Sequence, residues 1–303
     1  MVMLWGSFFP ILERLLRSWD ALSVTAARQV VGATALLLLL AATEGRRPVS
    51  VRAPAGRTLV LGAVGISLGS VLLSLGVLLS GGIMAALVAA TSPLCAALVA
   101  RLVFRMPLAR GLVVGTILAV AGGALSAFAG RAGGPLRGFG LGEVLIVAAN
   151  VVWCWFSIAA QRWMRGCSQL RIATLTTAAG ALVLVVICLA AGVSGAWRLR
   201  IGLGADTLLL LVYAGALPIG LGNVLWHHGV SRIGIGIAAM YNNLVPVSAV
   251  LVSLAGGVAP TAGQLAGGAI IVAGVLYAQV VALRAERARR GWAGPPEATD
   301  GTA

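Results

Sequence analysis

The chain has 303 residues, of which 60% are hydrophobic and only 10% are charged, and its mean hydropathy is +1.02. Its net charge of +14 comes from 22 arginines without a single lysine, and these arginines lie in short gaps between apolar runs. Soluble domains are about 45–50% apolar and about 25% charged. The composition therefore excludes a soluble enzyme and a disordered protein, and the scattered arginines do not form the basic face of a nucleic-acid-binding protein.

Apolar runs of nearly membrane-spanning length recur along the whole chain. A hydrocarbon core of about 30 Å requires roughly 20 residues of helix. The expected fold is an all-α membrane protein with about ten transmembrane helices. These helices are expected at 1–16, 21–42, 58–79, 83–104, 111–130, 141–163, 171–192, 206–228, 234–256 and 264–284.

The two ends of the chain depart from this pattern. The first run reaches Glu13 and Arg14 within a dozen residues, so it is too short to span a membrane. Either a tilted, partial helix or a start codon placed too late would explain this truncation, and we expect the latter. The segment lacks the basic start of a signal peptide. Residues 285–303 are charged, contain proline and are expected to form a disordered cytoplasmic tail.

Arginines in alternate loops indicate how the chain crosses the membrane. One set of loops holds 15 arginines and the other holds 6, with Arg28 set aside because it lies inside a span. Arginine-rich loops of multi-pass proteins lie in the cytoplasm. The count therefore predicts a protein of the cell (inner or plasma) membrane with both termini cytoplasmic, which requires an even number of spans.

The sequence also repeats itself at two offsets. A shift of 148 residues places Trp5 on Trp153 and Gly32 on Gly180. A shift of 153 residues superimposes glycines, prolines and polar residues: Gly62 on Gly215, Ser70 on Asn223, Gly69 on Gly222, Pro93 on Pro246 and Pro107 on Pro260. Each half then holds five expected helices, and an odd number forces the second copy to cross in the opposite sense. The chain is therefore expected to consist of two inverted five-helix repeats.

Three segments resemble those of a known family. They are Trp5-Gly6-Ser7, the stretch from Gly81 to Pro93 with its second copy from Gly234 to Pro246, and Trp153-Cys154-Trp155-Phe156-Ser157 before Gln161-Arg162. In these segments the chain resembles the EamA-like permeases of the drug/metabolite transporter superfamily. The resemblance implies a first EamA-like five-helix repeat at 1–130, a second at 140–284, and export or exchange of small metabolites, amino acids or drugs. The family often has a basic residue where Glu13 stands, so no role is inherited there.

Polar side chains near the membrane midplane are costly and usually face other protein groups or a wet cavity. Both halves contribute such residues, as a site between repeats requires. The candidate substrate-binding residues are Ser70, Thr91, Ser92, Asn150, Trp153, Asn223, Tyr241, Asn242 and Asn243. Interhelical hydrogen bonding is the alternative role for the single serines and threonines, and simple packing is the alternative for Trp153. Three adjacent polar residues at 241–243 exceed what packing needs.

Prolines and one arginine inside the spans suggest further roles. Pro93 and Pro246 are candidate gating kinks, because proline frees the carbonyl four residues earlier and permits a bend. A kink satisfied by a neighbouring helix is the alternative. Arg28 could snorkel outward, pair with Glu13 or hold a substrate carboxylate, and we favour snorkelling or a structural pair.

The sequence has no Walker loop, zinc signature or nucleophile elbow, so no metal, no cofactor and no catalytic residue are expected. The expected partners are a small-molecule substrate and the lipid bilayer, with coupling to protons or a counter-solute left open. The function expected is a secondary transporter that exports small organic metabolites, amino acids or drugs by alternating access. A non-transporting membrane sensor or assembly protein, and a membrane-embedded enzyme, are the alternatives.

Overall fold

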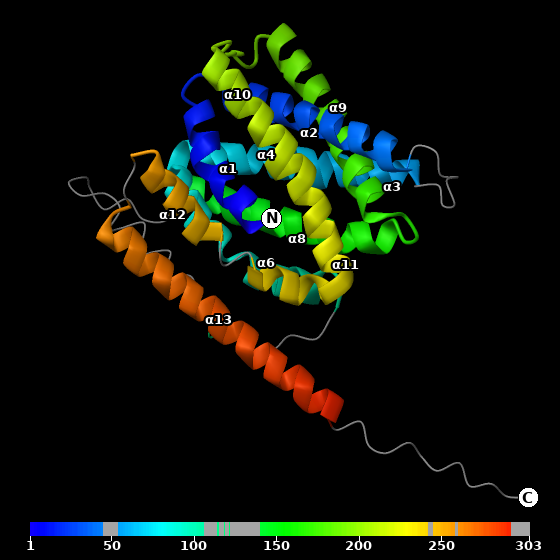
Figure 1. Cartoon of the computed structure of the whole chain (residues 1–303), viewed down its shortest axis with the longest axis vertical. Coiled ribbons are helices and arrows are strands. Elements are labelled where there is room, and N and C mark those ends of the chain that lie inside the picture. Colours follow the sequence, from blue (N-terminus) through cyan, green and yellow to red (C-terminus); the bar gives the residue numbers. More distant parts are fainter. Residues whose placement is uncertain are drawn as a thin grey trace, which may run out of the picture.

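The computed structural model describes residues 1–44, 54–105, 140–241, 245–257 and 260–291, together with the isolated positions 114, 118 and 121. All regular secondary structure in these ranges is helical, as expected from the sequence. The first half contains α1 (Val2–Leu15), α2 (Ala21–Glu44), α3 (Ala55–Val60), the π-helical segment η1 (Leu61–Leu68), α4 (Gly69–Ser80), α5 (Gly82–Ala89) and α6 (Ser92–Leu102) (Figure 1). The second half contains α8 (Leu141–Trp163), α9 (Gln169–Val193), α10 (Ala205–Ala214), the π-helical segment η2 (Gly215–Leu221), α11 (Gly222–Tyr241), α12 (Val245–Ala255) and α13 (Ala262–Gly291).

Within the described residues, 5 helical stretches are long and apolar enough to cross a membrane: Ala21–Glu44, Ala55–Ser80, Leu141–Trp163, Gln169–Val193 and Ala205–Arg232. α5 and α6 together make a sixth candidate, with a bend of 50° between them. The expected total of ten stays a prediction. α1 has 14 residues and α12 has 11, and the span expected at 111–130 lies outside the described residues except for positions 114, 118 and 121.

Side-chain oxygens fix several helix starts. The Asp20 carboxylate accepts hydrogen bonds from the backbone N–H groups of Leu22 (3.0 Å) and Ser23 (2.9 Å) at the start of α2. Ser168 accepts one from Arg171 at the start of α9 (3.1 Å). These bonds satisfy N–H groups that have no partner within the helix, which stabilises the observed boundaries.

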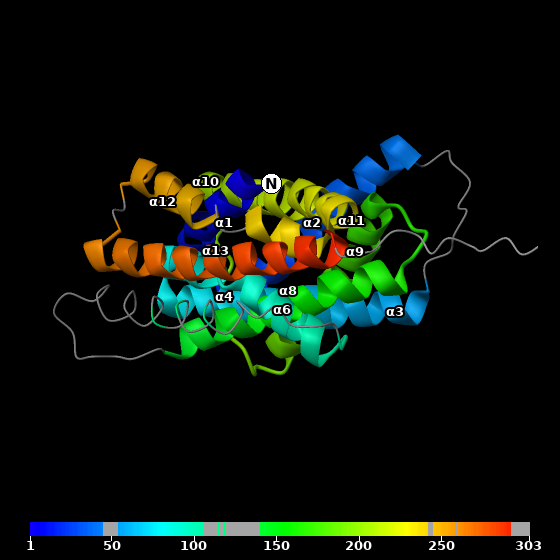
Figure 2. The same ribbon diagram turned by 90° about the horizontal axis from the view of Figure 1, so that it is seen from below.

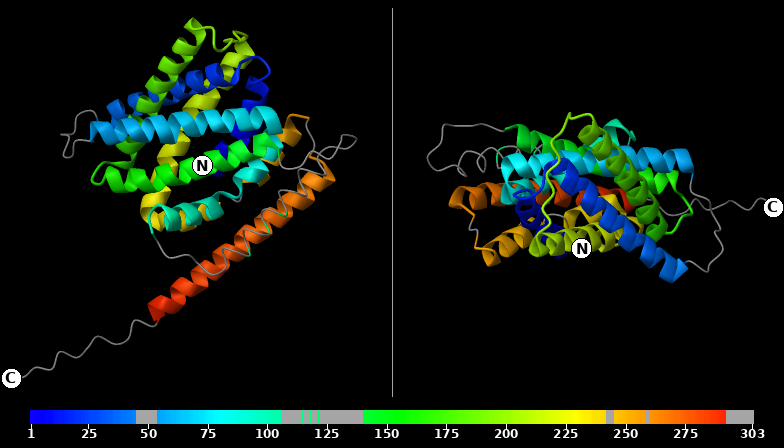
Figure 3. Two further views of the ribbon diagram at one scale, coloured as in Figure 1. Left: turned by 180° about the vertical axis from the view of Figure 1, so that it is seen from behind. Right: turned by 90° about the horizontal axis from the view of Figure 1, so that it is seen from above.

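The helices form two layers. In Figure 2, α10, α11 and α12 lie along one side of the molecule, and α3, α4, α6 and α8 lie along the other. α4 and α8 run side by side (Figure 3). Gly76 permits this approach, because a Cβ at that position would lie 2.5 Å from Cγ1 of Ile146. Small residues serve the same purpose in membrane helices generally.

α13 packs on the outside of the body, where the buried Ile271 joins Ile83, Leu87 and Leu94 in one apolar cluster. The helix continues to Gly291, so residues 285–291 are helical although they were expected to belong to the tail. Residues 292–303 lie outside the described part of the chain. Large apolar side chains on the outer surface of the bundle are exposed and suit contact with lipid, among them Leu38, Leu102, Val193 and Leu209.

Glycine contacts between the halves come in matched pairs. A Cβ on Gly62 of η1 would lie 2.7 Å from the backbone nitrogen of Gly180 in α9. A Cβ on Gly32 of α2 would lie 3.0 Å from the carbonyl oxygen of Gly215 in η2. The sequence offsets equate Gly32 with Gly180 and Gly62 with Gly215. The two contacts are therefore equivalent when the halves are exchanged, and so are the two π-helical segments that make them.

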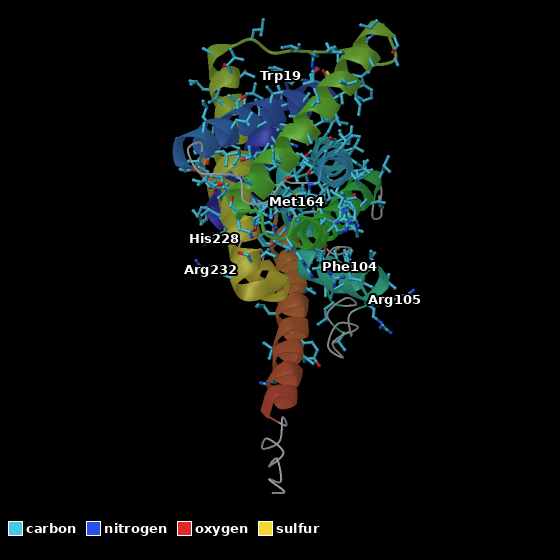
Figure 4. All side chains as sticks on the ribbon, turned by 90° about the vertical axis from the view of Figure 1, so that its right-hand side faces the viewer. Trp19, Phe104, Arg105, Met164, His228 and Arg232 are labelled. Atoms are coloured by element: carbon cyan, nitrogen blue, oxygen red, sulfur yellow. The ribbon has the colours of Figure 1, made fainter. Side chains whose placement is uncertain are left out.

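The labelled residues in Figure 4 lie toward opposite ends of the molecule. Figure 4 places Trp19, which follows α1, at one end, and Phe104, Arg105, His228 and Arg232 toward the other. The end at Trp19 is held together by Asp20, whose carboxylate accepts hydrogen bonds from the Trp197 indole N–H (2.9 Å) and the Arg200 backbone N–H (2.7 Å). These bonds tie the segment before α2 to the loop between α9 and α10.

Candidate functional site

A cavity of about 160 Å³ lies inside the described part of the molecule, where elements of both halves meet. α1, α2, η1, α4, α5 and α6 contribute to its wall from the first half, and α8, η2, α11 and α12 contribute from the second. The lining residues are Trp5, Phe8, Phe9, Arg28, Gln29, Gly65, Ile66, Gly69, Ser70, Leu73, Ala89, Ser92, Ala149, Asn150, Trp153, Pro218, Ile219, Asn223 and Val245.

Five residues expected from the sequence to bind substrate line this cavity: Ser70, Ser92, Asn150, Trp153 and Asn223. Thr91 lies just behind it, with its hydroxyl 3.4 Å from the Asn150 amide nitrogen. Tyr241 ends α11, but the placement of its side chain is outside what the structure describes. The other two members of that cluster, Asn242 and Asn243, also lie outside the described residues.

Three tryptophans from three helices meet at the cavity. Trp5 of α1 and Trp153 of α8 stand edge to face, with ring centroids 5.8 Å apart. Trp226 of α11 lies 5.3 Å from Trp5 and 6.2 Å from Trp153. Hydrogen bonds fix two of the indoles, because Trp5 Nε1 donates to the Pro218 carbonyl (3.0 Å) and Trp226 Nε1 donates to Ser157 Oγ (3.0 Å). Trp5 was not among the expected binding residues, although the 148-residue offset that equates it with Trp153 was a usable signal.

The break between α5 and α6 is anchored to α8. Pro93 was expected inside a continuous helix. In the structure it is the second residue of α6, in the first turn of that helix. The Asn150 side-chain amide lies 3.5 Å from the Ala89 carbonyl, the group whose release by Pro93 was predicted, and 3.4 Å from the Val88 carbonyl. The neighbouring helix α8 therefore supplies a donor to the freed Ala89 carbonyl, whereas the Val88 carbonyl also accepts from the Thr91 backbone N–H (3.0 Å) and hydroxyl (2.7 Å). Pro246 is the second residue of α12, and residues 242–244 before that helix fall outside the described part of the chain.

Arg28 points into the molecule and is only 2% exposed. Its Nη2 donates hydrogen bonds to Ser74 Oγ (3.1 Å) and to the Ser70 carbonyl (3.4 Å), and its guanidinium carbon lies 4.8 Å from the centroid of the Phe8 ring. The snorkelling favoured from the sequence is therefore wrong.

Glu13 lies apart from Arg28. Its carboxylate accepts a hydrogen bond from the Gly82 backbone N–H (2.8 Å) at the start of α5. Among the described residues, the ion pairs are Arg14–Asp206 (3.9 Å) and Arg171–Glu44 (3.0 Å). Hence the structural pair of Arg28 with Glu13, the other favoured interpretation, does not form.

Gln29 is a polar lining residue that the sequence reasoning missed. Its Nε2 donates to Ser70 Oγ (2.7 Å), while its buried Oε1 has no hydrogen-bond partner. A polar residue next to an arginine within a span was the signal that could have found it. In the described ranges, no group of three or more histidine, cysteine, aspartate and glutamate side chains is arranged to hold a metal ion.

The model of the EamA-like transporter family matches residues 1–128 and, a second time, residues 140–278. The chain belongs to this family. The family match confirms the resemblance found in the sequence, and with it a multi-pass membrane transporter that contacts lipid and a small-molecule substrate. Membership in a transporter family, and the transporter names of the relatives, also point away from an enzyme.

Relatives of known sequence or structure agree with this assignment. The chain is 25% identical to the uncharacterized transporter YyaM of Bacillus subtilis (strain 168), over 91% of this chain and 90% of that protein. It is 28% identical to a probable terminal-alkyne amino-acid exporter of Streptantibioticus cattleyicolor, over 91% of this chain and 89% of that protein. A protein of known crystal structure shares the fold with a TM-score of 0.68 at 21% identity, covering 94% of this chain and 96% of that one.

Proposed function

We propose that the chain is a secondary transporter of the cell membrane that exports small organic metabolites by alternating access. The observation that carries this proposal is that elements of both halves build the cavity. A site between two similar halves can be opened first to one side of the membrane and then to the other by rocking one half against the other. Residues 1–130 and 140–284 form the two repeats in this proposal, and they cross the membrane in opposite senses.

Matched contacts support a two-fold relation between the repeats. When two copies are related by a two-fold axis, a contact between residue i of one copy and residue j of the other recurs with the roles exchanged. The Gly62–Gly180 and Gly32–Gly215 contacts have this relation. The edge-to-face pair of Trp5 and Trp153 joins residues that the 148-residue offset equates, which is expected for side chains close to the axis.

The arginine count supports an orientation with both termini in the cytoplasm. In the arginine count, Arg105 and Arg232 fall in the arginine-rich set, although Arg232 lies within α11. Trp19 follows Arg14 and Arg17, which fall in the arginine-poor set. In Figure 4 Trp19 lies near the top of the helical body, whereas Arg105 and Arg232 lie in its lower part, above the far end of α13. This separation agrees with alternate loops on opposite faces. In this orientation the arginine-rich end faces the cytoplasm.

Amino acids are one class of solute to test, because one relative, at 28% identity, is named as a probable terminal-alkyne amino-acid exporter. The purified chain would be reconstituted into liposomes loaded with a cytoplasmic metabolite extract, and the released solutes would be identified by mass spectrometry. We expect release of a defined subset of solutes, driven by a proton gradient or by an external counter-solute.

Variants separate transport from leakage in this experiment. Trp153→Ala removes one wall of the cavity and is expected to abolish most of the release, whereas Leu38→Ala, at an exposed position facing lipid, is expected to leave it intact. Release no greater than from protein-free liposomes, under both gradients, would contradict transport and favour the sensor or assembly alternative.

A further inference from the structure

Arg28 is the only ionisable side chain among the residues that line the cavity in the described part of the chain. It lies on the cavity wall while being only 2% exposed, and no carboxylate of the described residues approaches it within 4 Å. A buried charge is strongly unfavourable unless an opposite charge or sufficient hydrogen bonds compensate it. The cavity wall therefore carries a positive charge that no described side chain neutralises.

Neutral groups hold the guanidinium in place but do not neutralise it. Ser74 accepts one of its hydrogen bonds and is itself bonded to Thr25 Oγ1 (2.6 Å), which fixes the position of the serine. Both hydrogen bonds of the guanidinium come from Nη2, and Nε has no partner. Because a guanidinium has five N–H donors in a planar fork that matches a carboxylate, the unused donors favour an anionic ligand of that geometry.

The remaining lining is neutral and partly aromatic. Gln29 lines the cavity as an uncharged amide, and its Oε1 is buried without a partner. Trp5 and Trp153 offer aromatic surface to an apolar or ring-shaped part. The cavity volume of about 160 Å³ is similar to that of a protein cavity of about 150 Å³ that accommodates benzene. A solute with one ring, or an aliphatic part of similar size, matches this space.

We propose that the cavity selects small organic monocarboxylates, with the carboxylate bound by Arg28, over zwitterionic amino acids of the same skeleton. This inference rests on the proposed transport function. A monocarboxylate makes the occupied cavity electrically neutral, whereas a zwitterion introduces an ammonium group beside Arg28 without any carboxylate in the lining to receive it. Electrostatic complementarity of this kind discriminates between solutes of equal size.

The test uses four probes with one phenyl ring and the same short chain: 3-phenylpropanoate, phenylalanine, 3-phenylpropanamide and phenethylamine. Binding to the purified, unmodified chain would be measured by calorimetry in detergent, and flux would be measured in liposomes. We expect 3-phenylpropanoate to bind roughly 10–100-fold more tightly than the other three, the range expected for hydrogen bonds to a charged group. Equal or tighter binding of phenylalanine or phenethylamine would overturn the proposal.

Variants test the role of Arg28 itself. Arg28→Gln is expected to reduce 3-phenylpropanoate binding to the level of the amide, and Arg28→Lys is expected to give an intermediate affinity because it keeps the charge without the fork. Arg198→Gln, in the exposed loop between α9 and α10, is the matched control and should bind as the parent does. Should the Arg28 variants fail to fold, the four-probe comparison on the unmodified chain still tests whether the cavity prefers a monocarboxylate.

The outcomes also separate this inference from the proposed function. Release of metabolites from liposomes without any preference for carboxylates would refute the assignment of Arg28 and leave transport standing. The absence of any protein-dependent flux would refute transport, whatever the probes bind.

Discussion

Asn150 connects the two halves through a small set of polar contacts. Its side-chain amide lies 3.4–3.5 Å from the Val88 carbonyl, the Ala89 carbonyl and the Thr91 hydroxyl, where the chain breaks between α5 and α6. It also lines the cavity. One amide thus stabilises the broken helix of the first half from α8 of the second, so the conformation of the break and the shape of the cavity depend on the same side chain.

Asn150→Leu keeps the side-chain volume and removes these contacts. We expect the free energy of unfolding to fall by about 0.6–1.5 kcal/mol, because the hydrogen bonds are long but their acceptors are buried. The measurement is the midpoint of denaturation in detergent. Val151→Leu, at the exposed neighbouring position on α8, should not change it. Equal midpoints for Asn150→Leu and the parent would show that Asn150 does not stabilise the break.

Asp20 makes the stability of the end at Trp19 dependent on pH. Partial burial raises the pKa of its carboxyl, but the hydrogen bonds donated by Ser23, Arg200 and Trp197 together outweigh burial and leave the pKa below its usual value. A carboxyl whose pKa is lower in the folded state contributes stability above its unfolded pKa of about 3.9. That contribution is lost as the pH falls through the folded pKa.

We therefore expect the melting temperature of the parent chain to fall between about pH 5 and pH 3 more steeply than that of Asp20→Asn, which cannot titrate there. Above about pH 5 the parent should be the more stable of the two, because the amide accepts fewer of the hydrogen bonds. Parallel pH profiles of the two proteins would contradict this role of Asp20. Thermal unfolding in detergent at a series of pH values provides both curves.

At the scale of elements, the sequence offsets equated residues that the structure places between the halves, but they did not indicate side-chain directions. The offsets equated Trp5 with Trp153 and Gly32 with Gly180, and these residues do lie where the halves meet. The direction of Arg28 could not be predicted, because it depends on Ser74 of α4, a partner that only tertiary packing supplies. Gln29, by contrast, could have been found from its place next to Arg28 within an apolar run. The η1 segment contains no proline that would indicate a π-helical irregularity in the sequence. Pro218 in η2 was such a signal, but it was not used.

The glycines of the π-helical segments can be tested as a matched pair. A Cβ on Gly62 would lie 2.7 Å from the Gly180 nitrogen, and one on Gly215 would lie 2.7 Å from the Arg28 carbonyl oxygen. Because backbone atoms cannot move aside easily, each alanine substitution is expected to lower the free energy of unfolding by about 1–3 kcal/mol. Gly56→Ala, where a Cβ meets nothing within 4 Å, should be neutral or slightly stabilising. A Gly62→Ala variant as stable as Gly56→Ala would contradict the close approach of η1 to α9.

At the scale of the whole molecule, the two repeats must cross the membrane in opposite senses if alternating access is to work as proposed. Two exposed serines report on this topology: Ser194, in the arginine-poor loop between α9 and α10, and Ser231, next to Arg232 of the arginine-rich set. The four native cysteines, which are buried or partly buried, are first replaced so that only the introduced thiol can react. A membrane-impermeant maleimide applied to intact cells is then expected to label Ser194→Cys at once.

Ser231→Cys should remain unlabelled by the same reagent until the membrane is permeabilised, because the arginine-rich loops are expected in the cytoplasm. α10, η2 and α11 separate the two positions as one candidate span, Ala205–Arg232, so opposite accessibility requires that this stretch crosses the bilayer once. Labelling of both thiols from the same side would contradict a single crossing, and the arrangement of two oppositely oriented repeats would fail with it. Full labelling of Ser231→Cys in intact cells, with Ser194→Cys protected, would keep the crossing and reverse the orientation.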